Sequence, residues 1–323
     1  MSEEKTDRND IIPVILMGSL FVLIHGLAIL VTQPFIDAGM QPAFDDINDP
    51  MNIVYIFAIL LVFTLIILLI AKFYKKQLIQ LIILGAIGYT AAYVIYPLIN
   101  LLIPNLSLIN IPIGNNVLLA ITLSTVLTIV CAILLVIVLY KYPEWYVIDL
   151  AGIIIGAGAI AIFGMSLGIL LVIIFLVCLA VYDAISVYKT KHMIELADTV
   201  MDLKLPVLLV IPKIKNYSLI KETKRLKEQL EDGEERDAFF MGLGDIVMPG
   251  ILVVAIYNSI PNGLPVSIGV MIGTLVGFTA LMHFVMKGKP QAGLPLLCGG
   301  AITGYIISSY LLFGKLVGLS LQF

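Results

Sequence analysis

Charged residues are scarce in this sequence. Asp, Glu, Lys and Arg together make up 13% of the 323 residues, whereas hydrophobic residues make up 60%. A soluble globule of this size needs far more polar surface, so the composition excludes a water-soluble protein and places the chain in a lipid bilayer. The net charge of -3 gives no basic field for a nucleic-acid partner, so we expect none.

Cysteine and histidine are also rare. The three cysteines, Cys131, Cys178 and Cys298, each fall in an apolar run, and they predict neither a disulfide framework nor a paired-cysteine metal site. We expect them to be small packing residues. The His-Glu-x-x-His motif of zinc proteases is missing from the sequence, so we predict no metal and no other cofactor.

Long apolar runs fill most of the chain. A helix that crosses a bilayer needs about 20 apolar residues, and about nine runs approach or exceed this length. The runs are Ile11–Val31, Ile53–Ala71, Leu78–Ile103, Val117–Tyr140, Val147–Met165, Leu167–Tyr188, Ala238–Tyr257, Val266–Met286 and Leu294–Phe313. The first run follows a mixed-charge head and reads as a retained span, not as a signal peptide. The sequence therefore predicts an all-α polytopic membrane protein.

The positions of Lys and Arg predict the orientation. Lysines follow the second, fourth and eighth runs, and both signs of charge fill the long connection after the sixth. The loops on the other side, Gln33–Asn52, Pro104–Asn116 and Asn258–Pro265, contain no Lys or Arg. Because positive loops stay on the cytoplasmic side, we expect the amino terminus inside and the carboxyl terminus outside, in a multi-pass protein of the cell membrane.

The long connection divides the chain into three parts. Residues 1–189 form an amino-terminal half with six spans, residues 190–237 a cytoplasmic loop, and residues 238–323 a carboxyl-terminal half with three spans. In the loop, Met193–Asp202 has an apolar and an acidic face, which predicts an amphipathic helix at the membrane surface. Val207–Ile211 is branched and too short to span, which predicts a strand. Lys221–Asp237 is interpreted as a solvated linker.

Small residues at a four-residue spacing predict close contacts between helix backbones. They are Gly152 and Gly156 in the fifth run, Gly269, Gly273 and Gly277 in the eighth, and Gly300 and Gly304 in the ninth. We interpret this spacing as packing of the spans against one another.

Two aspartates stand inside the predicted membrane. Asp183 lies shortly before the end of the sixth run, and Asp245 shortly after the start of the seventh. At about 1.5 Å per residue, both would lie about 10 Å below the same surface. An ionisable group at this depth is costly and points to a functional site. Two carboxyls in contact share one proton, so one can act as a base toward water while the other acts as an acid toward a peptide carbonyl.

The residues around these acids resemble a known family. Tyr182-Asp183, Gly242-Leu243-Gly244-Asp245 and a proline-containing start of the ninth span are similar to the presenilin and signal peptide peptidase family of intramembrane aspartyl proteases. The resemblance implies an aspartic endopeptidase that cuts single-span membrane proteins within their transmembrane segments. It also implies that Asp183 and Asp245 form the catalytic pair, and that Tyr182, Gly242, Leu243 and Gly244 contact the substrate.

The third family motif, Pro-Ala-Leu, departs from the pattern. Ala292-Gly293-Leu294-Pro295 stands in its place, opening the ninth span on the same side as the acids, and we expect these four residues to contact the substrate as well. The orientation and short hydrophilic parts are similar to compact microbial presenilins. Transmembrane substrates and lipid are the expected partners, and nothing in the sequence requires accessory subunits.

Other patterns point to different chemistry. A proton- or cation-conducting transporter or channel could use the same two aspartates, although no inverted repeat is visible. Gly164-Met165-Ser166-Leu167-Gly168 fits the G-x-S-x-G pattern of serine hydrolases, but no strand precedes it, so we interpret it as a helix turn. His25 and His283 are expected to be buried, hydrogen-bonded packing residues.

Overall fold

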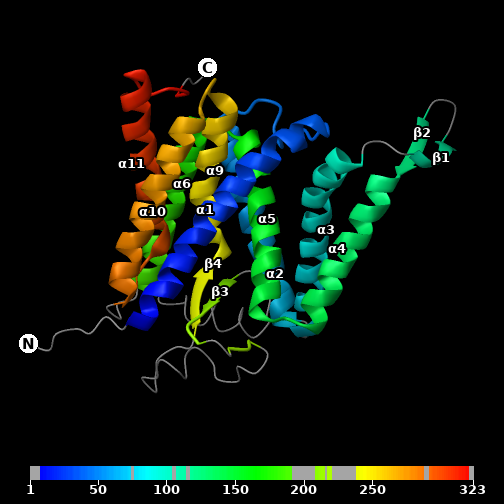
Figure 1. The fold of residues 1–323 in the computed structure, drawn as a ribbon, viewed down its shortest axis with the longest axis horizontal. Coiled ribbons are helices and arrows are strands. Elements are labelled where there is room, and N and C mark those ends of the chain that lie inside the picture. Colours follow the sequence, from blue (N-terminus) through cyan, green and yellow to red (C-terminus); the bar gives the residue numbers. More distant parts are fainter. Residues whose placement is uncertain are drawn as a thin grey trace, which may run out of the picture.

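The computed structural model describes residues 8–73, 76–103, 107–113, 117–190, 208–214, 217–219, 238–286 and 291–319, and these ranges contain nine α-helices. The helices are α1 (Arg8–Asp37), α2 (Met51–Phe73), α3 (Lys76–Leu102), α4 (Leu123–Lys141), α5 (Trp145–Ser166), α6 (Ile169–Ile185), α9 (Leu243–Ser259), α10 (Leu264–Met286) and α11 (Gly293–Phe313). A π-helical turn, η1 (Ser186–Thr190), follows α6. Figure 1 shows α3 and α4 as a pair beside the main bundle.

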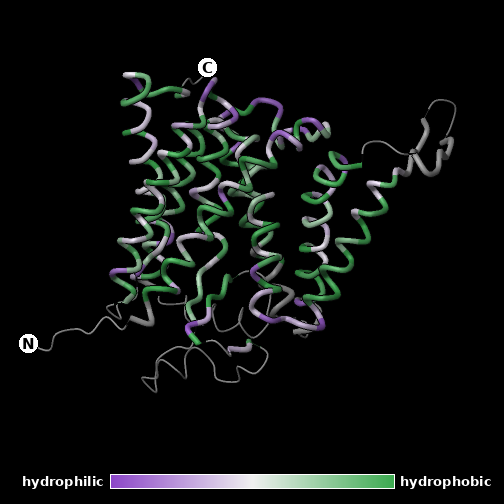
Figure 2. The backbone as a smooth tube through the Cα atoms, viewed as in Figure 1, coloured by the Kyte–Doolittle hydropathy of each residue, from purple (hydrophilic) through white to green (hydrophobic). Residues whose placement is uncertain are grey.

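The helices have the length and composition of membrane spans. Among the described residues, seven helices are long and apolar enough to cross a bilayer, and two shorter apolar stretches, Met51–Phe63 and Leu243–Ser259, lie in α2 and α9. Hydrophobic residues dominate along the helices and hydrophilic residues gather near their ends (Figure 2). The prediction of a polytopic α-helical membrane protein is confirmed. α1 begins and α11 ends on opposite sides of the bundle (Figure 1), as an odd number of crossings requires.

Two predicted spans begin with a strand instead of a helix. Val117–Thr122 forms β2, which pairs antiparallel with β1 (Ser107–Ile113). Helix α4 starts only at Leu123, where the Thr122 hydroxyl caps it by accepting the Thr125 N–H at 3.2 Å. The 19 residues of α4 rise about 28 Å, which already crosses a hydrocarbon core of about 30 Å, so the apolar run is longer than a span needs.

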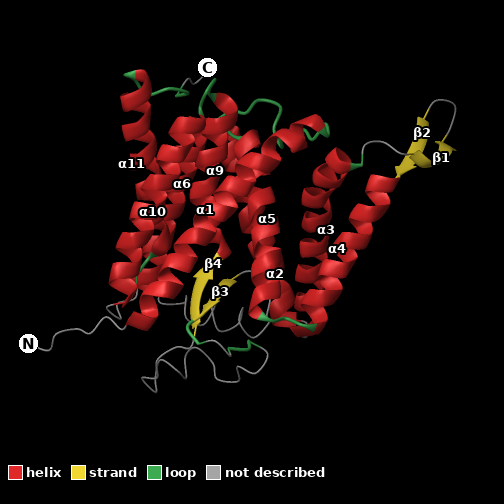
Figure 3. Ribbon diagram, viewed as in Figure 1, coloured by secondary structure: helices red, strands yellow, loops and turns green. Residues whose placement is uncertain are grey.

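The second such strand lies beside the predicted acids. Ala238–Gly242 forms β4, and it pairs antiparallel with β3 (Leu208–Pro212), with Val210 opposite Phe240. The predicted strand near Val207–Ile211 is therefore confirmed from Leu208 onward. Figure 3 shows this sheet at the lower end of α9. The predicted amphipathic helix Met193–Asp202 and the charged run Lys221–Asp237 lie outside the described residues.

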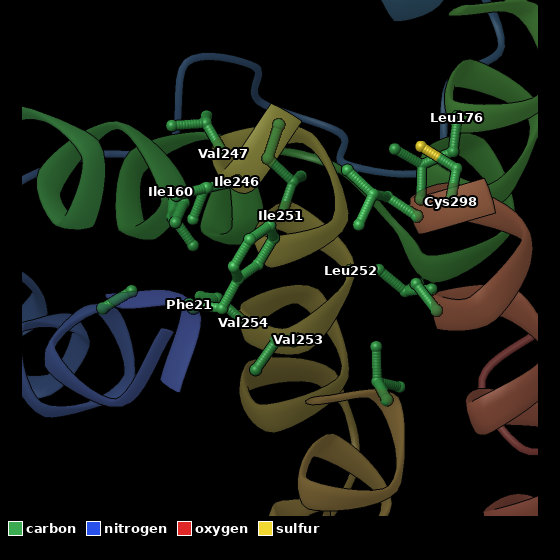
Figure 4. Packing of buried hydrophobic residues seen from close by; sticks show 14 of the residues in the cluster. Phe21, Ile160, Leu176, Ile246, Val247, Ile251, Leu252, Val253, Val254 and Cys298 are labelled. Carbon is green, nitrogen blue, oxygen red and sulfur yellow. The ribbon is translucent and has the colours of Figure 1, made fainter. Parts of the chain in front are cut away.

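Helix α9 is the centre of the bundle. It contacts α1, α5, α6, α10 and α11, and its residues are buried on all sides, as expected for a helix that is apolar all round. In Figure 4, α9 residues from Ile246 to Val254 lie between Phe21 and Ile160 on one side and Cys298 on the other. Cys298 thus packs as expected. Cys178 is exposed, so its expected packing role is wrong, because it lies on the outer face of α6.

The glycine spacing does bring helices close together. A Cβ atom built on Gly273 would collide with the carbonyl oxygen of Gly300, and one on Gly304 would collide with that of Gly269, so α10 and α11 touch through their backbones. On α5, Gly152 faces Leu209 of β3 and Gly156 faces Leu243 at the start of α9. The predicted close backbone contacts are therefore confirmed between α10 and α11, whereas the α5 glycines make room for side chains of β3 and of the start of α9.

Candidate active site

The carboxyl group of Asp183 lies against the first turn of α11. Asp183 is near the carboxyl end of α6, and its Oδ2 accepts the backbone N–H of Leu294 at 3.1 Å. The N–H of Gly293 donates to the same carboxyl group. The first N–H groups of a helix have no partner within the helix, and they favour a negative charge in front of them. The start of α11 therefore holds Asp183 in place.

The carboxyl group of Asp245 lies at the same turn. Asp245 is in the first turn of α9 and partly buried. A Cβ built on Gly293 would lie 3.2 Å from its Oδ2, and a Cβ built on Gly242 would lie 3.5 Å from the same atom. The two aspartates are near enough for their charges to interact. Residues from α6, α9 and α11 thus bring both carboxyls to Gly293 and Leu294.

The other predicted site residues have different surroundings. Tyr182 has a side chain that is 71% exposed on the outside of α6. Gly244 is exposed, and a Cβ built there would meet nothing within 4 Å. The Leu243 side chain instead packs toward α5, where its Cδ1 lies 3.1 Å from a Cβ built on Gly156. Ala292 is buried, and Pro295 lies in the first turn of α11, where its missing N–H breaks no helical bond.

The sheet leads directly into this site. β4 ends at Gly242, and α9 begins at the next residue, so the strand and Asp245 belong to one continuous segment. The Val210 N–H of β3 does not point toward β4, because it donates to Oδ1 of Asp149 at 2.8 Å. Val210 and Phe240 are opposite each other, so the alternation of an antiparallel pair turns the Phe240 N–H to the outer edge of β4.

Asp149 is the residue that the sequence analysis missed. It is an acid two residues inside the predicted fifth run, and its side chain is 8% exposed in the structure. An ionisable residue within an apolar run is itself a signal of function. The sequence did not single out Asp149, because an acid so close to the start of a run could place its charge at the membrane surface.

The two histidines differ from each other. His25 is 1% exposed, and its Nε2 lies 2.9 Å from the carbonyl oxygen of Ile246, the residue after Asp245. Its predicted role as a buried, hydrogen-bonded residue is confirmed. For His283 the same prediction is wrong, because this side chain is exposed near the end of α10, with its ring edge-on to Phe284.

The serine-hydrolase pattern carries no nucleophile. The Ser166 hydroxyl donates to the carbonyl of Ile162 at 2.6 Å and accepts the N–H of Ala43 at 2.8 Å. Ser166 ends α5 and is fully buried, so both of its hydrogen-bonding roles serve the chain itself. The prediction of a helix turn is confirmed.

Comparisons with known proteins identify the family of this chain. The family described as signal-peptide peptidase, presenilin aspartyl protease matches residues 18–314. A solved structure described as a presenilin family intramembrane aspartate protease, in space group C222, is 33% identical, with a TM-score of 0.67, and the match covers 93% of this chain and 99% of the other. A second so described, in space group P2, is 34% identical, with a TM-score of 0.66 and coverages of 93% and 98%.

No curated protein matches the chain. The alternative of a proton- or cation-conducting protein gains no support from the likenesses. Members of the matched family are aspartic-type endopeptidases and integral multi-pass membrane proteins. Because the family match spans nearly the whole chain and the structural likeness is accompanied by substantial sequence identity, this chain belongs to the signal-peptide peptidase and presenilin family of intramembrane aspartyl proteases.

Proposed function

We propose that Asp183 and Asp245 are the catalytic pair and that they hydrolyse peptide bonds within the transmembrane segments of single-span membrane proteins. The observation that carries this proposal is the meeting of both carboxyls at one backbone turn, where Leu294 donates to Asp183 and Gly293 lies against Asp245. Three helices from distant parts of the sequence converge there. A packing role alone would give no reason to bring two acids together inside a membrane.

The chemistry follows from a shared proton. Two carboxyls in contact cannot both ionise readily, so the pair holds one proton. The N–H groups of α11 stabilise a carboxylate at Asp183, which assigns the proton to Asp245. The Asp183 carboxylate then takes a proton from water as the water attacks the peptide carbonyl, and Asp245 protonates the carbonyl oxygen. When the tetrahedral diol collapses, its C–N bond breaks and Asp183 gives its proton to the leaving nitrogen. One hydroxyl of the diol returns a proton to Asp245, so the pair again holds one proton.

The substrate must be unwound before it can be cut. A transmembrane helix hides its carbonyls in its own hydrogen bonds, and the groups freed by unwinding need new partners in the membrane. An extended substrate segment could find these partners by adding a strand to a sheet edge. The strand predicted at Val207–Ile211, which corresponds to β3, offers one such edge. Asp149 occupies the outer edge of β3, so we now assign pairing to the outer edge of β4.

The orientation and surroundings complete the proposal. The amino terminus faces the cytoplasm, the cut is made near the cytoplasmic side of the cell membrane, and residues 190–237 form the cytoplasmic loop between a half of six spans and a half of three. The loops without Lys or Arg support this orientation. No feature of the sequence requires accessory subunits.

The test compares the native chain with Asp183→Asn and Asp245→Asn in liposomes that contain a single-span substrate peptide. Each variant keeps the size of the side chain but cannot share the proton, so cleavage should fall at least about a thousandfold, which removes about 4 kcal/mol of barrier lowering. The unfolding temperature of each variant should stay near that of the native chain. Native-like cleavage by either variant would contradict the assignment of the pair.

A further inference from the structure

We propose that Asp149 is a positioning residue of the protease: by holding β3 on α5, it sets where along a substrate strand the cut falls. Asp149 touches no reacting group. It acts through the β3–β4 sheet, whose second strand continues into the helix that carries Asp245. This inference rests on the proposed function, because it takes the two aspartates as catalytic and the outer edge of β4 as the place where the substrate pairs.

The contact between Asp149 and β3 is buried at both ends. Asp149 is 8% exposed and Val210 is 2% exposed, and the 2.8 Å bond between them joins a side chain to a backbone N–H. One turn further along α5, Gly152 makes room for the neighbouring strand residue, since a Cβ there would lie 2.8 Å from Cδ2 of Leu209. Asp149 and Gly152 together hold β3 against α5.

A second carboxylate of the same helix holds the chain that follows β3. Glu144 precedes α5 as its cap residue. Its Oε1 accepts the hydroxyl of Ser218 at 2.7 Å, and its Oε2 accepts the N–H of Leu219 at 3.1 Å. Helix α5 therefore fixes the described parts of the segment from Leu208 to Leu219 at two separate places through acidic side chains.

The sheet depends on these contacts for its position. A two-stranded sheet is marginal by itself, so its location is set by what it packs against. If Asp149 lost its acceptor oxygens, the Val210 N–H would remain buried without an acceptor, and β3 could regain a partner only by moving off α5 toward water. Asp245 would not follow, because the next residue, Ile246, is fully buried in the core. The edge of β4 would then shift relative to the two acids.

A shifted edge predicts a change in cleavage position. The substrate strand pairs with β4 residue by residue, so the offset between that pairing and the acids decides which peptide bond is attacked. With Asp149→Ala in liposomes, mass spectrometry of the products should show cuts spread over neighbouring bonds, and KM should rise at least about threefold with kcat little changed. Asp149→Asn keeps an acceptor oxygen, so it should keep the native cleavage position and KM.

Two further variants separate this role from general stability. Val210→Pro removes the donor of the same bond without removing a β3–β4 bond, and it should spread the cuts as Asp149→Ala does. Ser267→Ala removes a buried 2.8 Å bond to the Val253 carbonyl, between α10 and α9 and away from the sheet. It should lower the unfolding temperature but leave the cleavage position unchanged.

The outcomes distinguish this inference from the proposed function. If the native chain cuts no peptide, the proposed function itself fails. If the native chain cuts but Asp149→Ala keeps the native position and KM, or Asp149→Asn spreads the cuts equally, then only the positioning role is overturned. Should Asp149→Ala fail to fold, Val210→Pro decides: a spread of cuts supports the inference, and the native position overturns it.

Discussion

Gly293 is the residue at which the backbone comes closest to both acids. Its N–H donates to Asp183, while the space where a side chain would begin is 3.2 Å from Oδ2 of Asp245. A single methyl group would be a tight fit there, since the carboxyl would have to yield by a few tenths of an ångström. A branched side chain would compete directly with the carboxyl for the same volume.

The size of residue 293 should therefore control activity. The family motif Pro-Ala-Leu has alanine at this place, so Gly293→Ala should retain cleavage within about tenfold of the native chain, or about 1.4 kcal/mol. Gly293→Val should reduce kcat at least about a hundredfold, because its methyl groups displace the Asp245 carboxyl. Single-turnover cleavage of a single-span peptide measures both. A Gly293→Val variant with native kcat would show that the carboxyl does not lie against this glycine during catalysis.

His25 should stabilise the start of α9, next to Asp245. Its imidazole donates to the Ile246 carbonyl, and Gly250 leaves the space for it, because a Cβ there would lie 2.8 Å from Cδ2 of His25. His25→Leu removes a buried hydrogen bond and should lower the free energy of unfolding by about 1–2 kcal/mol. Denaturation in detergent, followed by circular dichroism, gives the value. His25→Gln, which keeps a donor, should recover part of the loss, and an unchanged His25→Leu would contradict this role.

Candidate site residues could be predicted from the sequence where an ionisable side chain stands in an apolar run. Asp183 and Asp245 were identified because acids in apolar runs are rare, and two at one depth suggest a pair. The contact of Asp149 could not be predicted, because its partner is a backbone N–H 61 residues away, and every non-proline residue has such a group. Likewise, the sequence analysis placed Ala292–Pro295 on the same side as the acids, but it did not predict that the Leu294 N–H would donate to Asp183.

At the scale of elements, hydrophobicity identified the spans but not their first residues. Ala238–Gly242 is as apolar as the helix that follows it, and an apolar run reads the same in either conformation. What makes it a strand is pairing with β3, and the connection between the two strands contains a long charged run. Its consequence for the proposed substrate pairing is large, because no other described strand pairs with the outer edge of β4, whereas a helix would have no such edge.

The outer edge of β4 can be tested at one backbone group. Phe240→Pro removes the N–H that points away from β3, and the bonds of the ladder should remain, because the flanking residues Phe239 and Met241 make them. We expect cleavage to fall at least about tenfold, which corresponds to the loss of about one substrate hydrogen bond of about 1.4 kcal/mol. Phe240→Ala keeps the N–H and is the matched control for the side chain. Equal activity of the two variants would exclude pairing at this edge.

At the scale of the whole molecule, the site exists only because the two halves of the chain pack together. Asp183 comes from the first six of the described helices, α1 to α6, whereas Asp245 and the turn at Gly293 and Leu294 come from the last three, α9 to α11. Helix α9 of the second half is surrounded by α1, α5 and α6 of the first as well as by α10 and α11. Because Asp183 lies near the end of α6 and Asp245 near the start of α9, the antiparallel directions of these helices bring both acids toward one end of the bundle.

Which surface that is depends on the orientation of the entire bundle. Asp45 lies in the connection between α1 and α2, on a side whose loops lack Lys and Arg, and Lys141 ends α4 on the other side. Both side chains are exposed. In a background with the three native cysteines replaced by alanine, Asp45→Cys should react in intact cells with a thiol reagent that cannot cross membranes. Lys141→Cys should react only after the membrane is opened, because the positive side stays in the cytoplasm.

The reverse labelling pattern would mean that the chain has the opposite orientation in the membrane, with the same chemistry at the two acids. The two acids and the sheet lie nearer the Lys141 side. Helix α6 runs from the opposite surface toward Asp183, and α9 runs from Asp245 back toward that opposite surface. Labelling of Lys141→Cys in intact cells would therefore place the site near the outer surface, and a substrate would have to be cut close to its external end. Labelling of Asp45→Cys alone would place the cut near the cytoplasm, so that the product with the inner end of the substrate is the one released into the cell.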